Sequence, residues 1–207
     1  MSYNLKQIFD FLEIANNLKK TYRFSSSKPK DLLKESSADH SWRLSLMSFF
    51  ISDELKLDIN KEKALKIAII HDLVEAITGD IDFRLIIEGK VTKNDKKKEE
   101  LKAIKKIKEC LPDKLGNEVH DLFMEYEAAS SPEARFIKAL DKLETMTNIK
   151  NHGYKAIDMP EPIITYADDA VKKFPELKGL LVLVKKELKE EFEKGNIPWK
   201  KEYDEVK

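Results

Sequence analysis

The sequence has only one cysteine, Cys110, among its 207 residues. No internal disulfide can form, which excludes a secreted scaffold held together by disulfides and favours a reducing compartment. No stretch approaches the roughly 18 uninterrupted apolar residues of a membrane-spanning helix, and the first twenty residues lack the apolar core of a signal peptide. We therefore expect a cytoplasmic protein without a membrane partner.

The chain also lacks an excess of charge of either sign. Its 38 lysines and arginines match its 38 aspartates and glutamates, so the formal net charge is zero. No overall positive field would draw a long nucleic acid to the surface, and we expect no such partner. Arginine is scarce and occurs as Arg23, Arg43, Arg84 and Arg135. Its planar fork is the better bidentate ligand for phosphate, whereas most lysines are expected on solvated helix faces.

What the chain does contain is helical periodicity along most of its length. Apolar residues recur at three- and four-residue steps over residues 5–20, and capping side chains at 36–39 and at Asn60 or Asp58 precede two further periodic stretches. The last of these runs through Val74, and Gly79 should end it. More helices are expected over 95–109, after Pro112, from Ser131-Pro132, around Tyr166 and up to about Glu193. No strand-like alternation occurs, so we predict an all-α fold of about seven to nine helices.

One part of this predicted helical region is chemically unusual. Residues 68–80 place the adjacent pair His71-Asp72 and two more carboxylates, Glu75 and Asp80, among apolar side chains. An ionised carboxylate that leaves water loses several kcal/mol of solvation unless a cation or hydrogen-bond donors replace it. Because His71, Asp72 and Glu75 are separated by helical spacings, they should face one cavity from about one turn of the helix. The stretch therefore suggests a metal site on a helix.

Two residues elsewhere have the chemistry to complete such a site. His40 lies at the start of the predicted second helix, and Asp141 lies on a strongly apolar helix. Each also has an ordinary alternative. His40 can be a partly exposed neighbour of the helix cap, and Asp141 can form an ion pair with Lys138 or Lys142.

The order and local contexts of these residues resemble the HD-domain superfamily of metal-dependent phosphohydrolases. Its pattern of one His, then His-Asp, then a distant Asp is matched by His40, His71, Asp72 and Asp141. The resemblance covers about residues 18–150. It implies a helical bundle of the HD type in which residues 1–207 form one domain, with helices of residues 160–207 packing on the metal-site core.

Three motifs resemble one branch of that superfamily. They are Glu-Ser-x-Ala-Asp-His-Ser-Trp over 35–42, His-Asp-x-x-Glu-Ala-x-x-Gly-Asp over 71–80 and Ala-x-Asp-Lys-Leu-Glu over 139–144. The branch contains the 5'-deoxynucleotidases, which remove phosphate from deoxyribonucleoside monophosphates. Two imidazoles and two carboxylates suit one divalent transition metal, Mn²⁺, Co²⁺, Fe²⁺, Ni²⁺ or Zn²⁺, better than Mg²⁺ alone. Such a metal would acidify its bound water and neutralise charge on the phosphoryl oxygens.

The resemblance also implies roles for four further residues. Glu75 would orient or deprotonate the attacking water, and Asp80 would assist the leaving oxygen or the substrate. A turn or cap after Gly79 is the alternative for Asp80. Arg23 would meet the substrate phosphate, and Phe24 would pack at the sugar. Phe24 has no indole donor, so it can exclude a 2'-hydroxyl by shape but cannot hydrogen-bond it.

We therefore predict a nucleotidase that acts on nucleoside 5'-monophosphates, prefers deoxynucleotides and forms a homodimer, as the proteins it resembles often do. Hydrolysis of another phosphoester, a cyclic nucleotide or a nucleoside triphosphate, is an alternative. The lack of an obvious Lys/Arg cluster near the motifs argues mildly against a triphosphate. A nucleotide-binding regulator without turnover would need the metal ligands but not Glu75 and Asp80. Trp42 is expected to lie in the core.

Overall fold

The computed structural model describes residues 4–29, 32 and 34–205, and these residues are mostly helical. Among them there is no strand, only an isolated antiparallel bridge between Tyr22 and Ser36. This part of the chain forms eleven α-helices, seven of which have ten residues or more. The predicted all-α fold is confirmed. The longer helices are α1 (Leu5–Ala15), α2 (Ser37–Glu54), α3 (Lys61–Ile70), α6 (Lys93–Cys110), α7 (Asp113–Ala128), α8 (Pro132–Asn151) and α11 (Lys178–Lys194). The shorter ones are α4 (Glu75–Thr78), α5 (Phe83–Ile87), α9 (Pro160–Ile164) and α10 (Asp168–Lys172).

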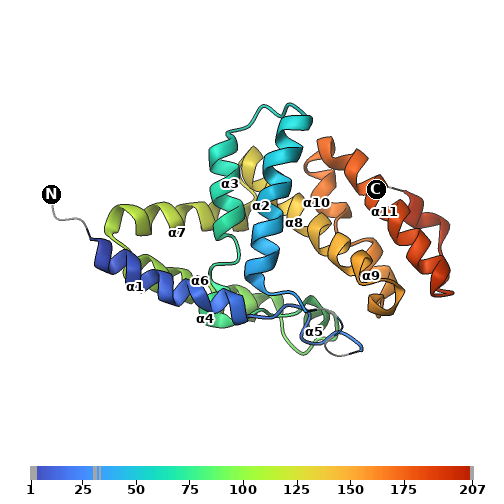
Figure 1. Cartoon of the computed structure of the whole chain (residues 1–207), viewed down its shortest axis with the longest axis horizontal. Coiled ribbons are helices and arrows are strands. Elements are labelled where there is room, and N and C mark those ends of the chain that lie inside the picture. Colours follow the sequence, from blue (N-terminus) through green and yellow to red (C-terminus); the bar gives the residue numbers. More distant parts are fainter. Residues whose placement is uncertain (1–3, 30–31, 33, 206–207) are drawn as a thin grey trace.

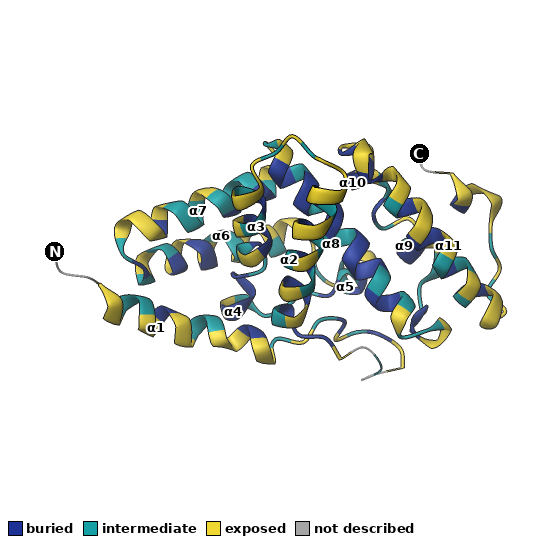
Figure 2. Ribbon diagram, turned by 45° about the horizontal axis from the view of Figure 1, so that its top comes forward, coloured by how far each residue is buried: buried dark blue, intermediate teal, exposed yellow. Residues whose placement is uncertain are grey.

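Helix α8 is the centre of the bundle. It contacts α2, α3, α7, α10 and α11. In Figure 1, α1, α6 and α7 lie on one side of the α2–α3 pair, and α9, α10 and α11 lie on the other. Figure 2 shows α8 as largely buried, whereas the outer faces of α1 and α11 are exposed. The fully buried apolar side chains of α8 include Phe136, Ile137, Leu140, Leu143 and Met146. Each contributes about 1.5–3 kcal/mol of burial free energy, so α8 is a firm support for the polar residues it carries.

The predicted helix starts are confirmed at three positions. Ser36 and Asp39 form a capping box at the start of α2, in which each side chain accepts from the other residue's backbone amide. Asn60 caps α3, and Ser131 caps α8. A cap of this kind typically stabilises a helix by about 1 kcal/mol. The cap of α2 places His40 on the first turn of that helix.

The prediction that the third helix continues through Val74 is wrong. Helix α3 ends at Ile70, and the next four residues form a turn before α4 begins. The cause is local. The imidazole Nδ1 of His71 donates to the carbonyl oxygen of Ala68 at 2.9 Å, the acceptor that a continuing α-helix would offer to the amide of Asp72. The His-Asp pair therefore projects from a turn and not from a helix.

Trp42 is a second correction, because its side chain is 66% exposed and does not lie in the core. Leu44, two residues further along α2, is completely buried. Two residues correspond to about 200° around an α-helix, so these two side chains lie on opposite faces. Trp42 belongs to an exposed apolar face of α2.

The C-terminal helices pack against α8 through α10 and α11. Beyond α11, Trp199 lies edge-to-face against both Phe192 and Tyr203, with ring centroids 5.2 and 5.4 Å apart. No helix in the described ranges is both long and apolar enough to cross a membrane. That the whole chain forms one domain stays a prediction.

Candidate active site

Four side chains from three parts of the fold meet at one point. His40 comes from α2, His71 and Asp72 from the turn after α3, and Asp141 from α8. His40 Nε2 lies 3.2 Å from His71 Nε2 and 3.1 Å from Asp141 Oδ1. Asp72 Oδ2 lies 3.2 Å from His71 Nε2 and 3.8 Å from His40 Nε2. The ligand atoms of His40, His71 and Asp72 all lie within 4.8 Å of one another and could hold a common cation, and Asp141 Oδ1 lies against this group through His40 Nε2.

Both imidazoles present Nε2 to this point because their other nitrogen is engaged elsewhere. His71 Nδ1 donates to the Ala68 carbonyl, and His40 Nδ1 lies 2.5 Å from Glu144 Oε2. With a proton on Nδ1 of each neutral ring, the two Nε2 lone pairs face each other, which requires a proton or a cation between them. A second nitrogen held by a carbonyl or a carboxylate is the usual setting of a metal-ligating histidine.

The protonation energetics lead to the same conclusion. Burial and the charge of Arg23 lower the pKa of His40, but the carboxylates of Glu144 and Asp141 outweigh them and raise it to about 10. Burial raises the pKa of Asp72 and of Asp141, yet the neighbouring imidazoles hold both below the usual range. The point thus attracts positive charge, and a divalent ion would displace the proton from His40.

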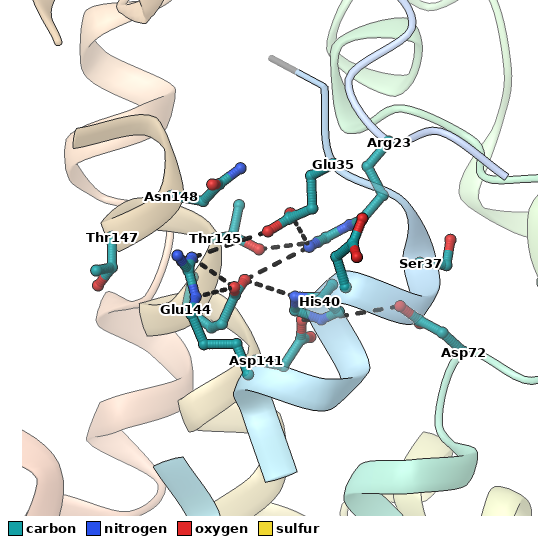
Figure 3. A network of polar contacts seen from close by, with 12 residues as sticks. Arg23, Glu35, Ser37, His40, Asp72, Asp141, Glu144, Thr145, Thr147 and Asn148 are labelled. Atoms are coloured by element: carbon teal, nitrogen blue, oxygen red, sulfur yellow. Dashed lines mark hydrogen bonds and ion pairs between the residues drawn. The ribbon is translucent and has the colours of Figure 1, made fainter. Parts of the chain in front are cut away.

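Glu144 on α8 connects His40 to two arginines (Figure 3). Arg43 Nε donates to Glu144 Oε1 at 2.6 Å, and Arg23 Nη1 lies 3.5 Å from Oε2. Glu35, His40 and Glu144 also have the donor types for a cation. The guanidinium groups of Arg23 and Arg43 already lie against both carboxylates, so this second group is occupied by the protein itself. Glu144 ends the third motif, but nothing in its sequence context predicts this role.

Asp141 is held from its other side by Tyr126. The Tyr126 hydroxyl donates to Asp141 Oδ2 at 2.9 Å, which leaves Oδ1 for the shared point. Neither Lys138 nor Lys142 lies within ion-pair distance of Asp141 among the described residues, and Lys138 pairs with Glu127 instead. The alternative interpretation of Asp141 as an ion-pair residue is therefore wrong.

The four ligand atoms lie beside a cavity of about 630 Å³, a volume within the usual range of small-molecule sites. The predicted site residues are brought together here. Seven of the eight line the cavity, namely Arg23, Phe24, His71, Asp72, Glu75, Asp80 and Asp141. The eighth, His40, lies behind them and is completely buried, which also contradicts the alternative of a partly exposed neighbour of a cap.

Glu75, at the start of α4, is buried at the cavity wall with 4% of its surface exposed. Its Oε2 accepts a hydrogen bond from Ser37 Oγ at 2.5 Å, which ties α4 to the first turn of α2. Burial and the charges of Asp72 and Asp80 raise the pKa of Glu75 well above its ordinary value. Burial likewise raises the pKa of Asp80. A cavity that holds carboxyl groups with raised pKa beside a metal-binding point is equipped for proton transfer.

Arg23 and Phe24 reach the cavity from the segment that precedes α2. The Arg23 guanidinium is largely buried and donates to Glu35 Oε2 at 3.0 Å and to Thr145 Oγ1 at 2.9 Å. The Phe24 ring lies between the guanidinium carbons of Arg23 and Arg84, 5.1 and 5.6 Å from its centroid. The backbone of Phe24 has φ 58°, a left-handed conformation that bulky residues rarely adopt. With 4% of its surface exposed, Phe24 forms part of the cavity wall and not a projecting platform.

The cavity is also lined by a group of lysines that were not predicted from the sequence. They are Lys93, Lys96 and Lys97 from α6, and Lys138 and Lys142 from α8. The prediction that no Lys/Arg cluster lies near the motifs is therefore wrong, because lysines that are distant in the sequence lie together in the folded structure. Helical periodicity assigns these lysines to polar faces, and only the packing of α6 and α8 around one cavity brings them together.

Comparison with known proteins agrees with this geometry. Residues 15–170 match the family described as HD domain. The chain belongs to the HD domain family. It is 34% identical over 180 residues to the 5'-deoxynucleotidase HDDC2 of Danio rerio, covering 86% of each chain. It is 36% identical over 152 residues to the 5'-deoxynucleotidase hdd1 of Schizosaccharomyces pombe, covering 72% of this chain and 73% of the relative. The predicted resemblance is thereby confirmed.

Solved structures share the fold of this HD domain protein. A crystal structure described as a predicted metal-dependent phosphohydrolase from Magnetospirillum magnetotacticum has a TM-score of 0.73 at 23% identity, covering 94% of this chain and 96% of that one. A conserved hypothetical protein from Pyrococcus furiosus has a TM-score of 0.68 at 29% identity, covering 86% and 99%. The predicted helical bundle of the HD type is confirmed.

Proposed function

We propose that this HD domain protein is a metal-dependent phosphohydrolase that removes the 5'-phosphate from nucleoside monophosphates and prefers deoxynucleotides. The observation that carries the proposal is the group of ligand atoms from His40, His71 and Asp72, with Asp141 against His40, beside a cavity that also holds the buried carboxyl group of Glu75. Relatives named 5'-deoxynucleotidase, 30–36% identical over most of this chain, support the class of substrate.

The four ligands would hold one divalent transition metal, Mn²⁺, Co²⁺, Fe²⁺, Ni²⁺ or Zn²⁺, because mixed imidazole and carboxylate donors suit these ions. When bound, the metal acidifies water and neutralises phosphoryl charge. Glu75 accepts the proton of the attacking water, and its raised pKa suits that task. Ser37 fixes the carboxyl group in place by its hydrogen bond to Oε2.

Asp80, Arg23 and Phe24 complete the proposed mechanism. Asp80 has a raised pKa and lines the same cavity, so in its protonated form it can donate to the leaving oxygen of the sugar. Arg23 provides positive charge to the phosphate site from a position fixed by Glu35 and Thr145. Phe24 offers an apolar wall against the sugar, which accepts a deoxyribose by shape alone.

We further propose that the protein is a homodimer that pairs through α2. Trp42, Leu46, Phe49 and Phe50 lie within one face of this helix and are 66%, 37%, 54% and 61% exposed. A contiguous exposed apolar face is typical of an interface. Analytical ultracentrifugation should give about twice the chain mass of 24.0 kDa for the wild type and a monomer for Phe49→Glu. A monomeric wild type would exclude the dimer.

The lone cysteine supports the cytoplasm as the proposed compartment.

The proposed activity is tested by phosphate release from a panel of deoxyribo- and ribonucleoside monophosphates. The protein is first treated with a chelator, and Mn²⁺, Co²⁺, Zn²⁺ or Mg²⁺ is then restored. Release should depend on the metal, be faster with a transition metal than with Mg²⁺ and favour deoxynucleotides. No release from any monophosphate would overturn the proposal. Metal-dependent nucleotide binding without release would instead identify a regulator.

A further inference from the structure

The arginines of this protein are already engaged by its own acceptors. Arg23 donates to Glu35 and Thr145, as described above. Arg43 donates to Glu144, and Arg84 makes a bidentate contact with Asp158 at 2.8 to 3.1 Å. The fourth, Arg135, caps carbonyl oxygens at the end of α7. Only Arg23 of the four lines the cavity, and its hydrogen bonds are largely committed, so any further cationic partner of a phosphate there must be a lysine.

Lys142 is a cavity lysine that none of the protein's own acceptors holds, as are Lys93 and Lys97 among the described residues. It follows the metal ligand Asp141 on α8 and lines the cavity. Its ammonium nitrogen lies 4.0 Å from the ring centroid of Tyr166. Across the part of the chain that the structure describes, it has no hydrogen-bond or ion-pair partner. Lys138, one turn away, differs because it donates to the carbonyl oxygens of Tyr126 and Glu127.

Lys96 faces the same space from α6. Its side chain is 30% exposed, and its ion pair with Glu100 is long, at 3.5 Å. Lys96 lines the cavity together with Glu75, Asp80 and Asp72, so it shares that space with the proposed base and with two of the other acidic site residues. Lys96 from α6 and Lys142 from α8 line the same cavity, so both bring positive charge to one volume. Two like charges that repel each other across a cavity are relieved when an anion lies between them.

We propose that Lys96 and Lys142 together bind the phosphoryl oxygens of the substrate as a clamp. The ammonium group of Lys96 reaches these oxygens from α6, and that of Lys142 reaches them from α8. The proposal rests on the phosphohydrolase function proposed above and adds the residues that select and orient its phosphate. A lysine carries three donors on a flexible stem, so each ammonium group can follow the oxygens as the phosphoryl group changes shape. With this clamp, phosphate is recognised by side chains of α6 and α8 as well as by the segment that carries Arg23.

The clamp is tested with Lys96→Gln and Lys142→Gln in metal-loaded protein. Each variant should raise both the KM for a deoxynucleoside monophosphate and the Ki for inorganic phosphate by about tenfold or more, the loss expected for one charge-assisted hydrogen bond. Metal content should stay that of the wild type. Lys142→Arg, which keeps the charge, should recover most of the affinity for phosphate. Matched controls are Lys102→Gln on α6 and Lys150→Gln on α8, whose side chains pair with Glu99 and Glu187 away from the cavity.

The outcomes separate this inference from the proposed function. If the wild type hydrolyses monophosphates but both glutamine variants keep its KM and its Ki for phosphate, the clamp is wrong and the lysines only balance the acidic lining. If the wild type hydrolyses no nucleotide, the function fails. Calorimetric binding of inorganic phosphate to the Mn²⁺-loaded wild type and variants then decides the clamp by itself. Equal affinities would overturn it, and a variant that loses affinity at an unchanged melting temperature would support it.

Discussion

His40 and Glu144 share a buried contact of 2.5 Å between imidazole Nδ1 and carboxylate Oε2. The contact places the proton of the neutral imidazole on Nδ1 and leaves Nε2 free for the point where the four ligand atoms meet. Arg43 in turn binds Glu144, so the group that orients His40 is itself fixed. The geometry of the proposed metal site thus depends on Glu144, which is not among its proposed ligands.

Replacing Glu144 with Gln should weaken the binding of a divalent metal about 10- to 100-fold, the effect typical of losing a carboxylate behind a metal-bound histidine. The amide keeps the size of the side chain but loses the charge that supports His40 and pairs with Arg43. Competition with a fluorescent chelator measures the affinity, and Glu118→Gln, on the surface of α7, is the matched control. Wild-type affinity in Glu144→Gln would show that the contact does not support the metal.

Replacing Asp72 with Ala should abolish metal retention, because Asp72 Oδ2 is one of the four converging atoms. Metal content measured by elemental analysis should fall to the background level. The rise in melting temperature that added Mn²⁺ gives the wild type should also disappear, since only the native state of a metal-binding protein is stabilised in this way. Asp53→Ala, at an exposed ion pair on α2, should retain both properties. A metal-loaded Asp72→Ala protein would remove Asp72 from the ligand set.

Glu75→Gln should separate metal binding from turnover. The amide oxygen can still accept from Ser37, so the local fold is kept, but the side chain can no longer take a proton from water. Metal content should equal that of the wild type, while kcat for the best deoxynucleotide falls by about 10²- to 10⁴-fold. A rate close to that of the wild type would show that another group activates the water.

Glu35 should make the stability of the protein depend on pH. Burial, followed by the charge of Glu144, raises its pKa from 4.5 to about 7. A carboxyl group whose pKa is higher in the folded state binds its proton more tightly there, so its stabilising contribution is complete below about pH 4.5 and is lost as the pH rises through about 7. Relative to Glu35→Gln, the free energy of unfolding of the wild type should therefore fall between these values and level off above them. Urea denaturation at a series of pH values measures it, and a constant difference would contradict the shift.

The sequence predicts the metal site better than the rest of the cavity for physical reasons. Carboxylate and imidazole groups in apolar surroundings are costly without a cation, so the His71-Asp72 pair can be recognised from its neighbours in the chain, whereas Asp141 is predicted from the resemblance of its motif to the HD-domain superfamily. The turn at His71 could not be predicted, because it depends on a side chain competing for one carbonyl oxygen of its own helix. The positions of Lys96 and Lys142 depend on how α6 and α8 lie around the cavity. The helical periodicity within each helix gives no information about this packing.

Tyr126 is the clearest case of a residue that acts on the site through another side chain. Its hydroxyl donates to Asp141 Oδ2 at 2.9 Å, and its ring lies edge-to-face against His71 with centroids 5.3 Å apart. Tyr126→Phe keeps the ring and the contact with His71 but leaves the Asp141 oxygen without its donor. We expect about tenfold weaker metal binding, because the carboxylate is no longer fixed, and a loss of stability of about 1 kcal/mol.

Metal titration calorimetry and thermal unfolding of the metal-free protein measure the two effects of Tyr126→Phe separately. The matched control is Tyr154→Phe, at a tyrosine that is 41% exposed. If Tyr126→Phe were less stable but bound metal as tightly as the wild type, the hydroxyl would serve only packing. A weaker metal affinity at nearly unchanged stability would establish that Tyr126 positions Asp141, because a role confined to the fold of the metal-free protein cannot change the affinity selectively.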